Sequence, residues 1–128
     1  MKKKIKCLCV VMALAMICSA SVFAAAYTFT ITPPYAGCIR YTTNSVAVTG
    51  STPYVSPSVA ATPTTYVIVP GKAAANYATN ILTGISTAGR RNFTYNPGYG
   101  GSGQRYYLAA HSTETQFLQY KVTGTWNP

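Results

Sequence analysis

The most regular alternation of hydrophobic and polar positions lies near the end of the chain. Within residues 118–126, Leu118, Tyr120, Val122 and Trp126 share one side with a glycine, and polar residues occupy the other side. Residues 105–110 alternate in the same way. A period of two predicts strands with one buried face. Because the polar linker 111–115 is short enough for a loop, we expect the two segments to pair as an antiparallel hairpin.

Further segments show the same strand pattern. Residues 27–32 alternate aromatic or aliphatic side chains with threonine, and residues 64–69 are rich in β-branched side chains. Residues 38–49 carry two apolar sets of different parity, which predicts a bulge or bend near Asn44 and Ser45.

Two stretches carry mixed signals. Residues 50–63 hold three prolines among small polar residues, which favours a loop or a ragged edge strand. In residues 72–86 an alanine run favours helix, whereas asparagine, threonine and glycine oppose a long one. We expect a short helical turn there, then a strand over residues 78–86, and another short strand at residues 92–96. In total, six or seven short strands predict an all-β fold, an antiparallel β-sandwich or a small barrel.

The first residues have the layout of a secretory signal peptide. A lysine-rich start precedes a mostly apolar run, and small residues follow at the cleavage spacing. We expect residues 1–24 to be the signal peptide, with cleavage after Ala24 or Ala26, and residues 25–128 to form a single β-sandwich domain. The apolar run is nearly long enough to stay as an anchor. Since serines and alanines near its end favour cleavage, we expect no stable transmembrane anchor.

Cleavage changes the charge and the cysteine count. Four of the ten Lys and Arg residues lie in the leader, so six remain against one acid, and the net charge becomes 6 − 1 = +5. Three of the four cysteines are also lost, which leaves Cys38 without an intramolecular disulfide partner. We interpret Cys38 as a half-buried strand residue. Pairing with another molecule is the alternative.

Carboxylates are nearly absent, and this excludes several chemistries. The chain has no Asp, and Glu114 is its only Glu. Paired-carboxylate glycoside hydrolysis, Ca²⁺ cages and two-metal phosphoryl sites therefore lack their residues, as does a Ser-His-Asp triad. The mature chain would offer one His, one Cys and one Glu, too few for a zinc site. We expect no enzyme activity, no metal and no cofactor. The remaining enzymatic hypothesis is a nucleophile–base pair of Cys38 with His111.

Residues 98–103 match the glycine pattern of dinucleotide-binding loops. That pattern needs a strand before it and a helix after it, so that phosphate meets a helix N-terminus. The residues that follow have a strand pattern instead. We therefore interpret the segment as an inter-strand loop, in which Tyr99 is a candidate ligand contact.

Cations and tyrosines are the remaining functional signal. With almost no acids, the surface field is positive and attracts anionic partners, and exposed tyrosine beside cations suits sugar or protein contacts. We expect a secreted, extracellular domain in association with the cell wall, which binds an anionic cell-wall polymer, a lipid headgroup or a surface protein. Export and the lack of a dense basic face argue against nucleic acid. The candidate binding residues are Arg90, Arg91, Tyr99, Arg105, Tyr107 and Lys121.

A resemblance in outline covers most of the mature chain. It rests on the leader, the Tyr-Thr-Phe-Thr-Ile strand at residues 27–31, the Arg-Tyr-Thr-Thr segment at residues 40–43, the glycine loop, residues 106–110 and the terminal segment 120–126. The chain resembles small exported proteins of Gram-positive bacteria whose function is unknown, and is more distantly similar to the lactococcin-type bacteriocins. The resemblance implies an extracellular β-sandwich, and a bacteriocin relation implies action at a cell envelope.

Two further hypotheses therefore stand beside envelope binding. One is a bacteriocin-like antimicrobial effector. The other is a structural subunit that assembles through strand edges, because flat threonine-rich strands can pair with other chains.

Overall fold

The computed structural model describes residues 26–33, 38–59, 62–73, 75–114 and 119–128. The expected signal peptide at residues 1–24 lies outside this range, so its cleavage stays a prediction. Within these ranges there is no helix that is long and apolar enough to cross a membrane.

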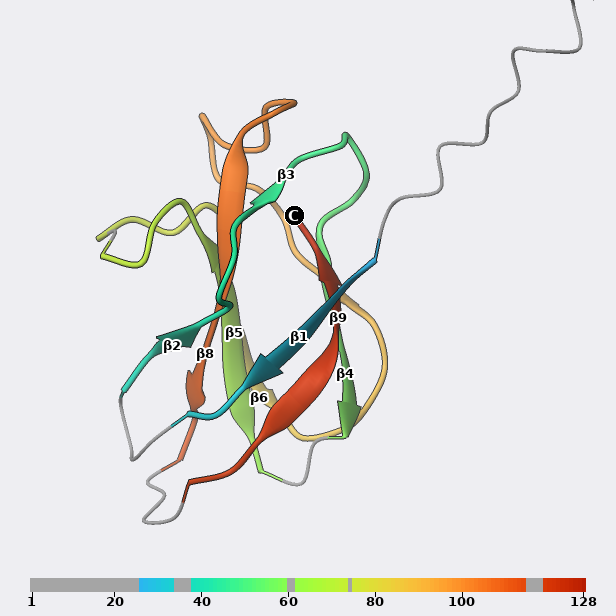
Figure 1. Cartoon of the computed structure of the whole chain (residues 1–128), viewed down its shortest axis with the longest axis vertical. Helices are drawn as coiled ribbons and strands as arrows, with labels where there is room; N and C mark the ends of the chain where they lie inside the picture. Colours follow the sequence, from blue (N-terminus) through green and yellow to red (C-terminus); the bar gives the residue numbers. More distant parts are fainter. Residues whose placement is uncertain (1–25, 34–37, 60–61, 74, 115–118) are drawn as a thin grey trace, which may run out of the picture.

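Two antiparallel sheets pack against each other, which confirms the predicted β-sandwich (Figure 1). One sheet has four strands in the order β1-β9-β4-β7, and the other has five, in the order β2-β8-β5-β6 with β3 also paired to β8. Three of the nine strands have only two residues, which explains why the sequence predicts fewer. The strands are β1 (Tyr27–Ile31), β2 (Arg40–Tyr41), β3 (Val46–Ala47), β4 (Tyr54–Val59), β5 (Thr64–Val69), β6 (Leu82–Ile85), β7 (Arg91–Asn92), β8 (Arg105–Ser112) and β9 (Val122–Asn127).

The core lies between the two sheets and consists of alternate residues from their inner faces. Burial of each large apolar side chain contributes about 1.5–3 kcal/mol to stability, so the period of two in most strands follows from burial of one face against this core. The main contributors are Phe29, Ile31, Val55, Val122 and Trp126 from the four-stranded sheet, and Tyr66, Ile68, Tyr106, Leu108 and Ala110 from the other.

The expected terminal hairpin is wrong. β8 pairs with β2, β3 and β5, whereas β9 pairs with β1 and β4, so the two strands lie in different sheets. The predicted alternation in β9 is correct, because Val122, Gly124 and Trp126 are buried and the threonines between them are only half-buried. The pattern determines which side chains face the core, but it does not determine which strand lies alongside. A polar linker also suits a connection that crosses between two packed sheets.

The predicted irregularity near Asn44 is confirmed. Arg40 pairs with Ala110, and Val46 pairs with Tyr106. The chain advances by 46 − 40 = 6 residues on one side and by 110 − 106 = 4 on the other, so two extra residues bend the backbone between β2 and β3.

Residues 50–63 contain β4, which lies between β9 and β7 in its sheet. β4 pairs with β9 along its whole length, whereas β7 covers only Tyr54 and Val55. Pro57 lies in the uncovered part, where its missing N–H costs no ladder bond, and the register shifts directly after it. The expected edge strand is therefore correct only for the second half of β4, which β7 does not cover, and the loop alternative is wrong for residues 54–59.

The described positions of residues 72–86 contain no helix; Lys72 and Ala73 form a turn, and Ala74, at the centre of the expected helical turn, lies outside the described residues. The strand is also shorter than expected: β6 starts at Leu82, and Thr79 makes only an isolated bridge to Tyr95. Side chains here form the hydrogen bonds to backbone groups that a helix would form within itself. The Thr79 hydroxyl accepts from the Ile68 N–H, and the Asn96 amide donates to the carbonyls of Tyr77 and Thr79. The strand predicted at residues 92–96 is reduced to β7 and this bridge.

Candidate functional site

The outer face of the five-stranded sheet carries a second, smaller apolar layer. Val67, Val69 and Ala109 point away from the core, yet each is at most 3% exposed. Half-buried Tyr41 and Tyr107 pack against them. β5 is thus buried on both sides. Tyr41 and Tyr107 lie over it and are only half-buried, so a partner can reach their rings.

Two cations lie beside Tyr107 on this outer face. The Nζ atom of Lys72 is 5.2 Å from the centroid of the Tyr107 ring, within cation–π range. Arg105 lies two residues before Tyr107 on β8, so both side chains share one side of the strand. The bend between β2 and β3 holds both cations: Lys72 donates to the Thr43 carbonyl at 3.2 Å, and Arg105 donates to the hydroxyl and carbonyl of Ser45 at 3.0 and 2.7 Å.

We call Tyr41, Lys72, Arg105 and Tyr107 the basic aromatic face. Its cations bond only to neutral oxygens, so their charges are not compensated by these contacts. Glu114, the only acid, follows the far end of β8. From the start to the end of β8 is roughly 23 Å at 3.3 Å per residue. Because the Debye length is about 8 Å at physiological salt, the Glu114 charge is largely screened from this face.

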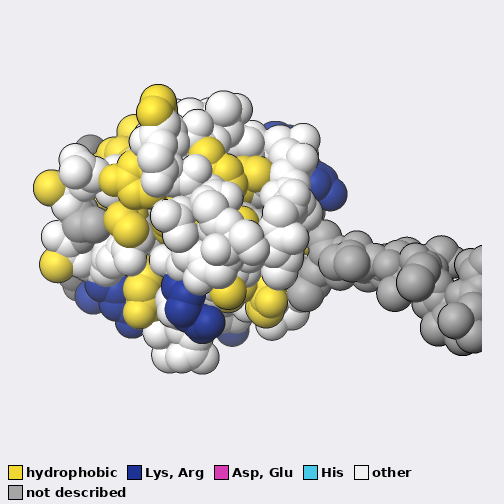
Figure 2. Space-filling model, turned by 90° about the horizontal axis from the view of Figure 1, so that it is seen from above, with side chains coloured by type: hydrophobic (Ala, Val, Ile, Leu, Met, Phe, Trp, Pro, Cys, Tyr) yellow, Lys and Arg dark blue, Asp and Glu magenta, His cyan; other side chains and the backbone are white. Residues whose placement is uncertain are grey.

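A second cation–tyrosine pair lies on the outer face of the four-stranded sheet. The guanidinium carbon of Arg90 is 4.0 Å from the centroid of the Tyr54 ring, and its Nε donates to Asn92 at 2.9 Å. Arg91 donates to the Thr87 hydroxyl at 2.8 Å. The outer faces of the two sheets point in opposite directions, so one flat ligand cannot cover both pairs. Figure 2 accordingly shows Lys and Arg in separate groups at the margins of a largely uncharged surface.

The structure brings together only two of the six predicted binding residues, Arg105 and Tyr107. Arg90 and Arg91 lie on the other sheet, and Lys121 is exposed directly before β9. The sequence did not single out Tyr41 and Lys72 as site residues. Their approach to Tyr107 depends on the pairing of β8 with β2 and β5, which no local pattern reveals.

The glycine loop at residues 98–103 is built around packed tyrosines. The Tyr99 ring meets the Tyr106 ring edge-on at 6.4 Å, and the Gly100 N–H donates to the Tyr106 hydroxyl at 2.9 Å. A Cβ on Gly100 would approach Cγ of Tyr95 to 2.7 Å, and its φ of 86° also favours glycine. These contacts give the glycines a structural role, and Tyr99 is half-buried in them.

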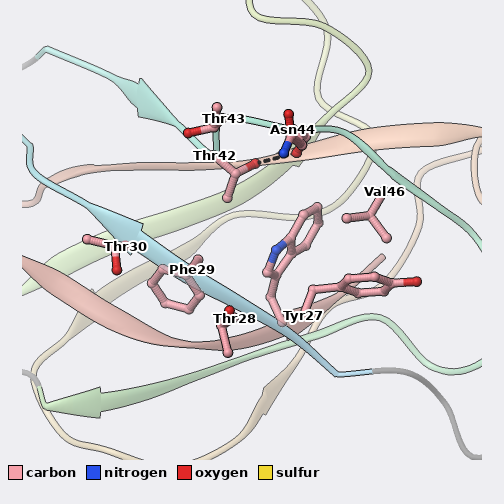
Figure 3. A pocket seen from close by; sticks show the side chains of 9 residues that line it. Tyr27, Thr28, Phe29, Thr30, Thr42, Thr43, Asn44 and Val46 are labelled. Atoms are coloured by element: carbon pink, nitrogen blue, oxygen red, sulfur yellow. Dashed lines mark hydrogen bonds between the residues drawn. The ribbon is translucent and has the colours of Figure 1, made fainter.

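A slot of about 300 Å³ opens between the sheets at the edge formed by β1 and residues 42–46. Figure 3 shows Tyr27 and Phe29 extending from β1, with Thr42 and Asn44 on the opposite wall. Among the described residues, no charged side chain lines it, and Trp126, which is only 1% exposed, belongs to its lining. The slot is therefore chemically different from the basic aromatic face.

Cys38 and His111 do not form a hydrogen-bonded pair within the described part of the chain. Cys38 is exposed and precedes β2, so its interpretation as a half-buried strand residue is wrong. The Nδ1 atom of His111 lies 2.8 Å from the carbonyl oxygen of Ser112. In the described ranges, no three His, Cys, Asp or Glu side chains are grouped so that they could hold a metal ion.

Comparison of the chain with known protein families, with curated proteins and with solved structures finds no match. A function for this chain is therefore inferred from its own geometry.

Proposed function

We propose that this chain is an exported, non-enzymatic domain that binds an anionic component of a cell envelope or cell surface through its basic aromatic face. One observation carries the proposal. Lys72 and Arg105 flank the Tyr107 ring, and their hydrogen bonds go only to neutral oxygens. A cation that lacks a carboxylate partner retains its full attraction for an anion that arrives from solution.

The cations keep enough donors to bind such an anion. Lys72 uses one of its three N–H groups, and Arg105 uses two of its five. The Arg105 guanidinium is fixed in place by Ser45, so less side-chain entropy is lost on binding. Charge-assisted hydrogen bonds to phosphate or carboxylate are about twice as strong as neutral ones. The Tyr107 ring adds apolar area for carbon atoms of the ligand.

The chemistry fits a polyanion that combines phosphate or carboxylate with carbon-rich units, such as an acidic wall polymer or a lipid headgroup. A bacteriocin-like role remains a prediction from the resemblance alone. The structural-subunit hypothesis has one supporting feature: β1 is an edge strand with no charge, proline or register shift, and such edges accept further strands. Light scattering over a range of protein concentrations tests it, because only assembly makes the mass rise.

The proposal is tested by fractionation of the native protein between medium, wall and membrane, at low and at high salt. We expect wall or membrane association at low salt and release at high salt, because screening weakens exposed charge contacts. Recovery in the medium alone at low salt would contradict the proposal. So would association that high salt does not release.

A further inference from the structure

We infer that the slot between β1 and residues 42–46 is a binding site for one uncharged saccharide unit. This inference is independent of the proposed function, because it concerns another surface and another kind of contact. No charged side chain lines the slot. Its occupancy should therefore be insensitive to salt, unlike binding at the basic aromatic face.

The size and lining of the slot match a sugar ring. A volume of about 300 Å³ lies at the lower end of the range for small-molecule sites. The half-buried ring of Tyr27 and the edge of Phe29 supply apolar surface on the β1 side, and Thr43 and Asn44 lie on the opposite side with their hydroxyl and amide groups. A sugar ring carries an apolar C–H face and a rim of hydroxyl groups, so it needs both kinds of surface at once.

Trp126 lines the slot but is only 1% exposed, so little of its ring is open to direct contact with an occupant. Its surroundings still change when the slot is filled, because it forms part of the lining.

The main chain of β1 adds a second set of polar groups. β1 is the edge strand of its sheet, and the backbone groups that face away from β9 have no strand beside them. Thr28 and Thr30 line the slot even though their side chains are exposed on the outer face, so their backbone edge contributes to it. Free N–H and C=O groups at this edge suit the hydroxyls of a sugar, which both donate and accept.

A peptide strand fits the slot less well than a ring does. An added strand requires an extended, regular partner edge. β1 offers one, but the opposite wall contains the two-residue bend between β2 and β3. A strand could therefore pair with one wall only, whereas a compact ring contacts both.

The chain contains its own reporter for the test. Trp126 is the only tryptophan, so intrinsic fluorescence reports directly on the slot. The probes are cellobiose and diacetylchitobiose, which share a linkage and differ in their acetamido groups, added to about 10 mM, the range of weak millimolar binding. We expect a saturable change in Trp126 fluorescence with at least one probe, unchanged between low and high salt.

Variants of exposed residues decide whether the response arises in the slot. Asn44→Ala combined with Thr43→Ala should weaken probe binding at least tenfold, whereas Thr49→Ala, an exposed threonine outside the lining, should leave it unchanged. The absence of any saturable response to both sugars would overturn the inference, as would equal affinity in the double variant. A response only to a free peptide with the sequence of residues 27–31 would also overturn it and identify the slot as a strand acceptor.

Discussion

Gly124 of β9 lies directly opposite Pro57 of β4, and the two backbones approach so closely that no side chain fits between them. A Cβ on Gly124 would come within 2.8 Å of Pro57 Cα and would collide with the carbonyl oxygen of Ser56. The φ angle of Gly124 is not positive, so space alone requires glycine here. The contact holds the two strands together at the point where β4 begins to shift its register.

Gly124→Ala should therefore destabilise the fold. We expect a loss of about 1–3 kcal/mol in the free energy of unfolding, because a methyl group forced into a packed contact displaces the backbone. Urea denaturation measures this loss. Gly71→Ala is the matched control, since Gly71 has no positive φ and open space around its Cβ position, and it should change stability by less than about 0.5 kcal/mol. Equal losses in both variants would contradict the packing argument.

Alkaline pH should weaken the fold through Tyr66. Burial raises the pKa of Tyr66 to about 12, and a small contribution from Tyr120 acts in the same direction. The hydroxyl of Thr64 opposes this pKa shift, but its hydrogen bonds go to the Thr62 carbonyl and the Tyr120 hydroxyl. The Tyr66 hydroxyl is thus enclosed without a partner among the described residues.

The sign of the effect follows from the two protonation states. Below pH 10 Tyr66 is neutral in both the folded and the unfolded chain, and it adds no pH dependence. Between about pH 10 and pH 12 only the unfolded chain loses the proton, so the free energy of unfolding falls, by at most about 1.4 kcal/mol per pH unit. Tyr66→Phe should reduce this loss and should not lower stability at pH 8, because it removes an unsatisfied polar atom.

Urea denaturation at pH 8 and pH 11 measures the difference, with Tyr77→Phe as the control at an exposed tyrosine. The control should lose as much stability at pH 11 as the unsubstituted protein. Burial also raises the pKa of Tyr95 to about 12, with Tyr106 as a further cause, so part of the alkaline loss should persist in Tyr66→Phe. An identical pH dependence in Tyr66→Phe and Tyr77→Phe would contradict this account.

The Tyr107 ring should contribute both to packing and to binding. Tyr107→Ala uncovers the apolar layer that contains Val69 and removes the ring below Lys72, so both stability and polyanion binding should decrease. We expect about 1–3 kcal/mol of lost stability, because the ring is only half-buried. Tyr107→Phe keeps the ring and should retain both properties. Denaturation and binding assays on the same samples measure the two effects, and a Phe variant as weak as the Ala variant would exclude a role for the ring itself.

Cys38 should react in the folded protein. Its thiol is exposed, so a thiol reagent should modify Cys38 without denaturant. The modified protein should keep its stability and its polyanion binding, because Cys38 lies outside the basic aromatic face. Loss of a hydrolytic activity on modification would instead support the pairing of Cys38 with His111 as an active site.

The strands could largely be predicted, because the alternation of apolar and polar residues within a strand depends only on neighbouring positions in the sequence. In β1 and β9 the spacing of apolar residues follows directly from the pleat, and the change of parity after Thr43 identifies a bend that the structure contains. The unbroken β-branched run of β5 agrees with its burial on both sides. The terminal hairpin could not be excluded in this way. Side-chain parity is the same whether β9 lies beside β8 or across the core from it, so only the full set of strand pairs decides.

The candidate site was less accessible to prediction for the same reason. Arg105 and Tyr107 are two residues apart on β8, and their common side follows from the sequence. Lys72 is 35 residues away from Tyr107 along the chain (107 − 72 = 35). It reaches the ring because β5 and β8 are neighbours, which is a property of the topology. Arg90 and Arg91 looked equivalent in the sequence but belong to the opposite sheet.

The central claim is that a polyanion binds at Lys72 and Arg105 and not wherever the surface is positive. The most direct measurement is the affinity for an acidic wall polymer, or for vesicles with anionic lipid, of two double variants that each remove one lysine and one arginine. Lys72→Gln with Arg105→Gln should weaken binding at least tenfold and reduce its salt dependence. Arg40→Gln with Lys121→Gln removes the same charge from exposed positions outside the basic aromatic face and should weaken binding less than about threefold. Equal losses in the two double variants would contradict the account.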